Sequence, residues 1–114
     1  MINKVKEFML ACNHTVYVKN RVQVKLYENL VLEELEEFNE SVDTDNELKE
    51  LCDVLWVLIG YGFSKGWDME GAFNEVARSN MSKCVDGVVM KDMDGKVKKP
   101  FTYSEANVEP FLGG

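Results

Sequence analysis

Four carboxylate side chains are arranged as two matched pairs around a polar turn, with Glu34 and Glu37 before it and Glu50 and Asp53 after it. Residues 41–46 between the pairs are rich in Ser, Asp, Thr and Asn, which favour turns. A chain that reverses there as an antiparallel helix pair sets Glu37 level with Glu50. The same pairing sets Glu34 level with Asp53. Because clustered acids repel one another unless cations occupy them, and Mg²⁺ and Mn²⁺ prefer carboxylate oxygen, the spacing predicts a divalent-metal site.

A solvated helix face is the plainer interpretation of any acidic run, and an isolated acidic pair would be assigned that role. Three further glutamates on the first of these helices lie roughly opposite its apolar stripe, at about 100° per residue. Glu34 and Glu37 instead border the stripe, and Asp53 directly precedes the uncharged run of residues 54–64. The residues alone therefore leave metal binding and a plain surface role as two alternatives.

Apolar residues at three- and four-residue steps predict four helices, over residues 3–11, 21–41, 46–65 and 69–82. Residues 86–97 contain two short β-prone pieces around Asp94-Gly95, which predict a small hairpin or an ordered loop. Pro100 and Pro110 suggest that the remaining chain is an extended tail. The expected fold class is all-α, of four-helix-bundle type, with residues 1–114 in a single domain.

The third predicted helix is nearly apolar through residues 54–63, on all of its sides. A helix of this kind needs to be surrounded, which a monomer of 114 residues can hardly arrange. The sequence therefore predicts self-association, as a homodimer or a tetramer.

Composition excludes several classes of partner. The formal net charge is −7, whereas nucleic acids and anionic membrane surfaces need clustered Lys and Arg. No uncharged run reaches transmembrane length, and the N-terminal residues lack the apolar run of a signal peptide. The three cysteines are widely spaced and odd in number, which favours reduced thiols over a disulfide framework. We expect a cytoplasmic protein that binds neither nucleic acid nor membrane.

The acidic pairs also carry a resemblance to a known family. The runs Glu34-Leu35-Glu36-Glu37 and Glu50-Leu51-Cys52-Asp53 have the ExxE and ExxD spacing of the MazG-like all-α nucleoside triphosphate pyrophosphohydrolases. These enzymes are related to the dimeric dUTPases and to phosphoribosyl-ATP pyrophosphohydrolase. The resemblance spans roughly residues 20–110, looks closest to the compact, often phage-encoded branch, and includes residues 31–34, 53–57, 80–83 and 94–97, with Lys99 and Tyr103.

This resemblance implies Mg²⁺-dependent hydrolysis of a nucleoside triphosphate, such as a deoxynucleotide, to the monophosphate and pyrophosphate. It implies that the ligands of Mg²⁺, or of Mn²⁺ in its place, are Glu34, Glu37, Glu50 and Asp53. A metal-activated water would attack the α-phosphorus, and Glu34 or Glu37 would accept its proton. The expected location is the cytoplasm of a bacterium or of a phage-infected host.

Candidate substrate-binding residues lie outside the acidic motif. Lys83 and Lys96 would balance phosphate charge, although a surface role is an equal alternative for Lys96. Asn80 would hydrogen-bond a base or ribose edge, or would cap the fourth helix. Tyr61 continues the face of the second acidic pair and would stack on a nucleobase, although aromatic residues at helical spacing usually pack in a core.

Two rival functions stay open at this point. A non-catalytic helical interaction protein would use the acidic faces and the apolar helix as contact surfaces, and would bind no divalent ion specifically. A phosphoribosyl-ATP pyrophosphohydrolase would share the fold and the metal chemistry, and would differ in its substrate.

Overall fold

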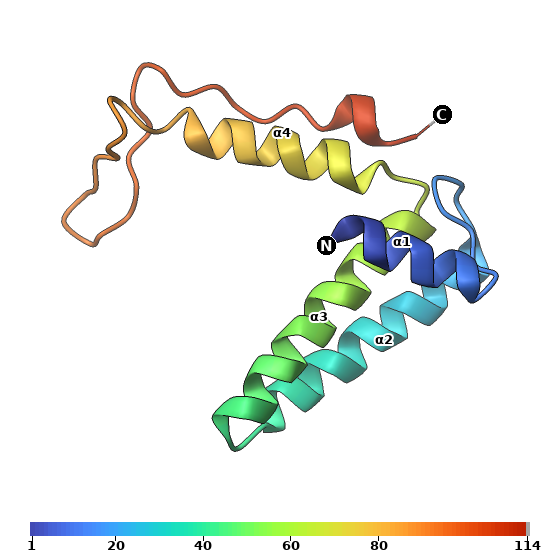
Figure 1. The fold of residues 1–114 in the computed structure, drawn as a ribbon. Helices are drawn as coiled ribbons and strands as arrows, with labels where there is room; N and C mark the ends of the chain where they lie inside the picture. The colour runs from blue at the N-terminus through green and yellow to red at the C-terminus, as the bar shows by residue number, and fades with distance from the viewer. Residues whose placement is uncertain (114) are drawn as a thin grey trace. The chain divides into compact units, whose positions relative to one another are not determined.

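The computed structural model describes residues 1–113, and within them the protein is all-α with no β-strand (Figure 1). The elements are α1 (Ile2–Ala11), α2 (Arg21–Glu40), α3 (Thr44–Ser64), α4 (Met69–Met81) and the short 3₁₀ helix η1 (Glu109–Phe111). The predicted fold class is confirmed, and each α-helix begins and ends within two residues of its predicted bounds. None of the described helices is both long and apolar enough to cross a lipid bilayer.

The chain divides into two compact units, which are described separately. The first contains Met1–Met69 together with residues 112 and 113, and the second contains Glu70–Phe111. The expectation of one domain over residues 1–114 stays a prediction.

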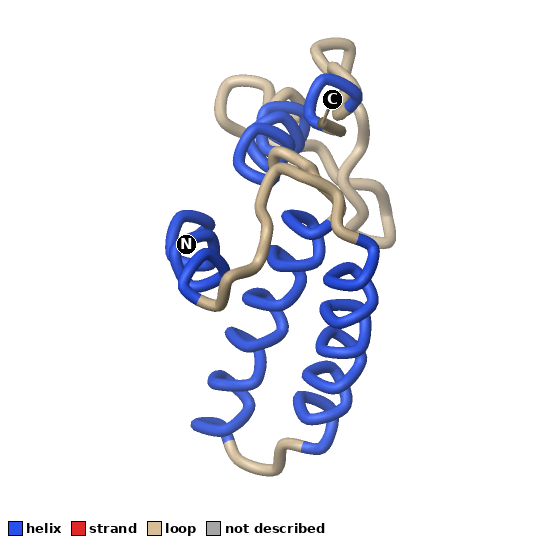
Figure 2. The backbone as a smooth tube through the Cα atoms, turned by 90° about the vertical axis from the view of Figure 1, so that its right-hand side faces the viewer, coloured by secondary structure: helices blue, strands red, loops and turns tan. Residues whose placement is uncertain are grey.

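Helices α2 and α3 form an antiparallel pair joined by a short turn (Figures 1 and 2). Each helix begins at a side-chain cap that its sequence encodes. Asn20 Oδ1 accepts a hydrogen bond from the Gln23 backbone N–H at 3.1 Å, and Asp43 Oδ1 accepts one from the Asn46 N–H at 2.9 Å. Such a cap contributes about 1 kcal/mol. Because only residues 41–43 separate the two helices, they must pack as immediate neighbours.

The core of the first unit lies where α1 crosses the α2–α3 pair. Its buried apolar side chains are Val5, Met9, Tyr27, Val57, Ile59 and Phe63. Burial of each contributes about 1.5–3 kcal/mol. A Cβ added at Gly60 would meet the ring of Tyr27, so the absent side chain lets the two helices approach closely. Nδ1 of His14, the one histidine of the sequence, lies 3.1 Å from the hydroxyl oxygen of Tyr27, a contact that fits a structural role.

A buried amide ties the loop after α1 to this helix pair. Gln23 Nε2 donates to Ser64 Oγ and to the Thr15 carbonyl oxygen, each at 2.8 Å. The Gln23 Oε1 accepts from the Thr15 backbone N–H, also at 2.8 Å. Ser64 Oγ in turn donates to the Gly60 carbonyl at 2.8 Å. Both amide hydrogens and the amide oxygen of Gln23 are therefore paired, and we call these residues the Gln23 network.

The second unit consists of α4 and the chain that returns beside it (Figure 1). The Arg78 guanidinium pairs with Glu75 at 2.7 Å, and Glu75 Oε2 accepts from the Asn107 backbone N–H at 2.8 Å. These contacts hold the pKa of Glu75 at about 2. The segment predicted to be a hairpin or ordered loop is joined by isolated antiparallel bridges, Val85 with Val88 and Lys91 with Val97.

Candidate metal centre

Three of the four predicted metal ligands meet between α2 and α3. Carboxylate oxygens of Glu34, Glu50 and Asp53 all lie within 4.8 Å of one another. Glu34 comes from α2, and the other two are neighbours one turn apart on α3. Oxygen ligands of an octahedral Mg²⁺, with bonds of about 2.1 Å, are separated by about 3–4.2 Å. The three carboxylates therefore have a spacing that small side-chain adjustments bring to that geometry.

Burial gives an independent indication of a ligand. Glu50 is 7% exposed as a residue, and its Oε2 is buried, as is the Oε2 of Glu34. Within residues 1–113 neither oxygen has a hydrogen-bond partner. An unpaired buried polar atom costs about 1–3 kcal/mol, and more when it is charged. Two such oxygens in one cluster fit a bound cation, and carboxylate-only ligands suit Mg²⁺ or Mn²⁺.

The electrostatics of Glu34 reflect this crowding. The pKa of Glu34 is raised to about 7, mainly by desolvation. The neighbouring carboxylates of Glu37, Asp53 and Glu50 also contribute to this rise. Glu37, the fourth predicted ligand, is exposed and adjoins Glu34, outside the group of three. Its role as a ligand stays a prediction.

A lysine that the sequence reasoning did not consider lies against the cluster. Lys49 Nζ is 3.0 Å from Asp53 Oδ2 and 3.3 Å from Glu50 Oε1. The two carboxylates, Asp53 first, raise the pKa of this ammonium group. Its position was available as a signal, because Lys49 directly precedes Glu50 and stands four residues before Asp53, a spacing that brings side chains together on a helix.

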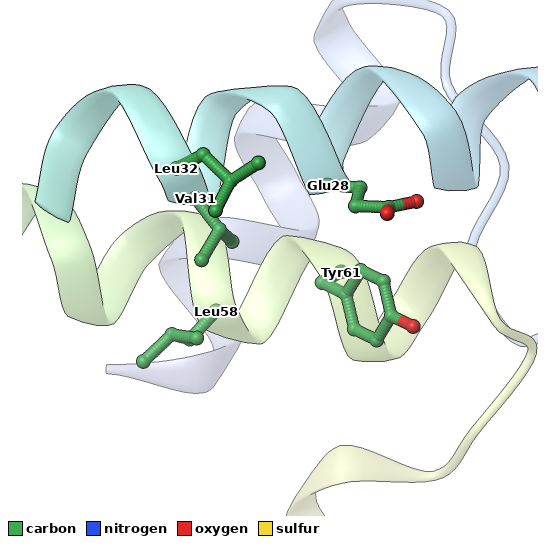
Figure 3. Close-up of a pocket in the computed structure, with 5 residues that line it drawn as sticks. All are labelled: Glu28, Val31, Leu32, Leu58 and Tyr61. Carbon is green, nitrogen blue, oxygen red and sulfur yellow. The ribbon is translucent and has the colours of Figure 1, made fainter.

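Tyr61 lines a pocket on the same helix pair, with a cavity volume of about 320 Å³. Figure 3 shows Val31 and Leu32 from α2 facing Leu58 and Tyr61 from α3, with the Glu28 carboxylate beside the Tyr61 ring. The pocket walls are therefore mostly apolar and include one acid, Glu28. The sequence analysis did not single out Glu28. The assignment of Tyr61 to a nucleobase stays a prediction.

The remaining predicted residues belong to the second unit. Lys83 Nζ donates to Asn80 Oδ1 at 3.2 Å, so these two residues of the predicted motif contact each other. Lys83 and Lys99 also lie over the Tyr103 ring, at 5.8 and 5.1 Å from its centroid. Lys96 is exposed, and its backbone N–H donates to Asp92 Oδ1 at 2.9 Å.

The arrangement has a defined chemical capacity. A divalent ion held by these three carboxylates would keep coordination positions free for water and for phosphate oxygens, because Mg²⁺ takes six ligands. Such a site suits hydrolysis of a phosphoric anhydride, in which the charge of the polyphosphate must be neutralised.

The chain matches a known protein family. The family model described as phosphoribosyl-ATP pyrophosphohydrolase matches residues 4–80, which is more than half of the 114 residues and includes all four predicted ligands. No curated protein matches the chain.

Proposed function

Because the chain belongs to the phosphoribosyl-ATP pyrophosphohydrolase family of MazG-like pyrophosphohydrolases, which act on nucleotide-type substrates, we propose that it hydrolyses a nucleoside or deoxynucleoside triphosphate to the monophosphate and pyrophosphate, with Mg²⁺. The observation that supports this most is the pair of unpartnered buried oxygens on Glu34 and Glu50. The family match also favours an enzyme over a non-catalytic interaction protein.

The acidic residues have separate proposed roles, as metal ligands and as the proton acceptor. Glu34, Glu50 and Asp53 would hold the ion, and Mn²⁺ would be an acceptable substitute because it shares the preference for oxygen. When bound, the ion supplies neutralisation of the phosphate charge and a lowered pKa for an attacking water. Glu37, adjoining the ligands, accepts the proton that the water loses, with Glu34 as the alternative base. The water oxygen bonds to the α-phosphorus, the bond from the α-phosphorus to the bridging oxygen breaks, and pyrophosphate leaves.

A second candidate substrate is phosphoribosyl-ATP itself, which the name of the matching family favours. It carries the same triphosphate chain, so the metal chemistry is unchanged. Lys83, Asn80, Lys96 and Tyr61 stay proposed substrate contacts for either compound.

Product analysis tests the reaction. Purified protein is incubated with a panel of ribo- and deoxynucleoside triphosphates and with phosphoribosyl-ATP, in Mg²⁺ and in Mn²⁺. The Glu50→Gln protein serves as the control for contaminating hydrolases. Monophosphate and pyrophosphate from the wild type alone support the proposal, and turnover of phosphoribosyl-ATP alone selects the second candidate. If folded protein hydrolyses none of these compounds, both candidate substrates are ruled out.

We also propose that the protein is a homodimer formed through α3. The exposed leucines Leu48, Leu51, Leu55 and Leu58 recur at steps of three, four and three residues, the spacing of a coiled-coil seam. Leu51 and Leu55 stand two residues to either side of Asp53, so at about 100° per residue they point away from the metal ligands. If the α3 helices of two copies pack antiparallel, Leu51 of each copy lies against Leu55 of the other. This arrangement also separates the acidic first turns of the two helices.

Sedimentation at micromolar concentration tests the dimer. We expect a species of twice 13.0 kDa, reduced to the monomer by Leu55→Glu and unaffected by Val22→Glu, which changes an exposed apolar residue on α2. A wild type that sediments only at 13.0 kDa contradicts the dimer.

A further inference from the structure

Lys49 is the one cation for which the described residues show an ion pair with the metal ligands. Its ammonium contacts Glu50 Oε1 and Asp53 Oδ2, whereas the Oε2 atoms of Glu34 and Glu50 are buried and unpaired. The Lys49 side chain is 67% exposed, so it reaches the cluster from the solvent side. The two buried oxygens are thus available to an ion, whereas the other two oxygens contact Lys49.

A divalent ion bound by these carboxylates would repel the Lys49 ammonium group. A divalent ion among the three carboxylates would carry two positive charges within a few ångströms of the ammonium. The Lys49 and Asp53 side chains are 67% and 38% exposed, so their pairing contributes little net free energy. The Glu50 side chain is 9% exposed, and the charge of a bound ion would replace that of the lysine beside it. The lysine side chain is a flexible four-carbon stem with a point charge, and phosphate oxygens are strong acceptors for it.

We propose that Lys49 is a displaceable counter-ion of the site, which offsets part of the acidic charge before the metal binds and then transfers to the phosphate chain of the metal-bound nucleotide. This inference rests on the proposed metal site and nucleotide substrate. It assigns phosphate binding to a residue of the same helix as two of the ligands. The lysines predicted from sequence for this role, Lys83 and Lys96, belong to the other unit.

The first readout is binding of Mn²⁺ alone, measured by titration calorimetry or by the paramagnetic signal of free Mn²⁺. At about 5 Å and near-aqueous dielectric, repulsion between an ammonium and a divalent ion corresponds to roughly tenfold in affinity, which movement of the side chain reduces. Lys49→Met should therefore bind Mn²⁺ about three- to tenfold more tightly than the wild type. The gain should shrink at high salt.

The second readout is the Michaelis constant, at saturating Mg²⁺, for the compound of the panel above that the wild type hydrolyses fastest. Lys49→Met should raise KM about tenfold with a smaller change in kcat, because a phosphate contact is lost, and Lys49→Arg should restore most of it. Lys4→Met is the matched control, since Lys4 is an exposed lysine paired with Glu7 at 3.4 Å on α1. It should change neither readout.

The outcomes separate this inference from the function on which it rests. Wild-type protein that binds Mn²⁺, together with Lys49→Met protein that binds it equally or more weakly, overturns the counter-ion role and leaves the metal site standing. Tighter Mn²⁺ binding with an unchanged KM overturns the transfer to phosphate. A wild type that binds no Mn²⁺ refutes the proposed metal site and this inference with it.

Discussion

The α2–α3 pair contains two buried polar groups that differ in one respect. In the Gln23 network both amide hydrogens and the oxygen of Gln23 have partners at 2.8 Å. In the acidic cluster, Glu34 and Glu50 each keep a buried oxygen without a partner among residues 1–113. Gln23 and Glu50 are similarly buried, at 5% and 7% exposure, so burial alone does not distinguish the two groups.

The difference teaches which of them is structural. A fully paired buried network fixes one conformation, and nothing further is needed to stabilise it. A buried carboxylate oxygen without a partner is destabilising by itself, and a bound ligand is one way to complete it. The Gln23 network therefore holds the helices together, and the unpartnered oxygens support the proposal that the acidic cluster binds a cation.

Gln23→Ala gives the largest expected effect on stability. It removes three hydrogen bonds of 2.8 Å and leaves the buried side chain of Ser64 with its bond to Gly60 alone. We expect the free energy of unfolding to fall by about 3 kcal/mol in urea titrations, with Mn²⁺ affinity unchanged in the folded fraction. A loss below about 1 kcal/mol would contradict the structural role assigned to the network.

Glu34→Gln should act in the opposite direction and should depend on pH. The pKa of Glu34 is raised from 4.5 to about 7, so between these values the folded metal-free protein binds more protons than the unfolded chain. Its stability therefore falls as pH rises through this window. The shift corresponds to about 3 kcal/mol, which solvent screening of this partly exposed group reduces to about 2 kcal/mol. Thermal unfolding of metal-free wild type and Glu34→Gln protein, at pH values from 4.5 to 8, should show this slope only in the wild type.

Two controls sharpen the pH experiment. Glu36→Gln removes an exposed acid of the same helix and should keep the wild-type slope. Added Mg²⁺ should cancel most of the slope in the wild type, because the ion replaces the proton on the carboxylates. Equal slopes in wild type and Glu34→Gln protein would show that Glu34 titrates normally.

Thr15→Val has the smallest expected effect. The Thr15 backbone N–H and carbonyl make the short bonds to Gln23, whereas its hydroxyl lies at 3.4 Å from both the Val18 carbonyl oxygen and Gln23 Oε1. Valine keeps the shape and the backbone bonds, so urea titration should show a change below about 0.5 kcal/mol. A loss comparable to that of Gln23→Ala would mean that the hydroxyl, not the backbone, completes the network.

The acidic cluster was predictable because its information is local. The i, i+3 spacing of each pair and the polar turn between them determine that Glu34, Glu50 and Asp53 meet, once both helices form. Helix bounds were predictable for the same reason, since caps such as Asn20 and Asp43 are sequence signals. The contact of Lys49 with the cluster is local in the same sense, because Lys49 stands one residue before Glu50 and four before Asp53.

The Gln23 network could not be predicted from the sequence. Gln23 and Ser64 are 41 residues apart, and their contact depends on how the far ends of α2 and α3 align with the irregular loop after α1. That loop contains left-handed backbone at Asn13 and Tyr17, for which the sequence offers no glycine signal. The pocket beside Tyr61 likewise depends on the alignment of side chains from two helices.

The short turn between α2 and α3 has a consequence for how the protein folds. Contacts across a three-residue connection close early, because little chain entropy is lost in forming them. We therefore expect the acids of the cluster to come together before the loop after α1 docks, so that their mutual repulsion opposes this early step. A divalent cation is therefore expected to speed formation of the helical hairpin as well as to stabilise the finished protein.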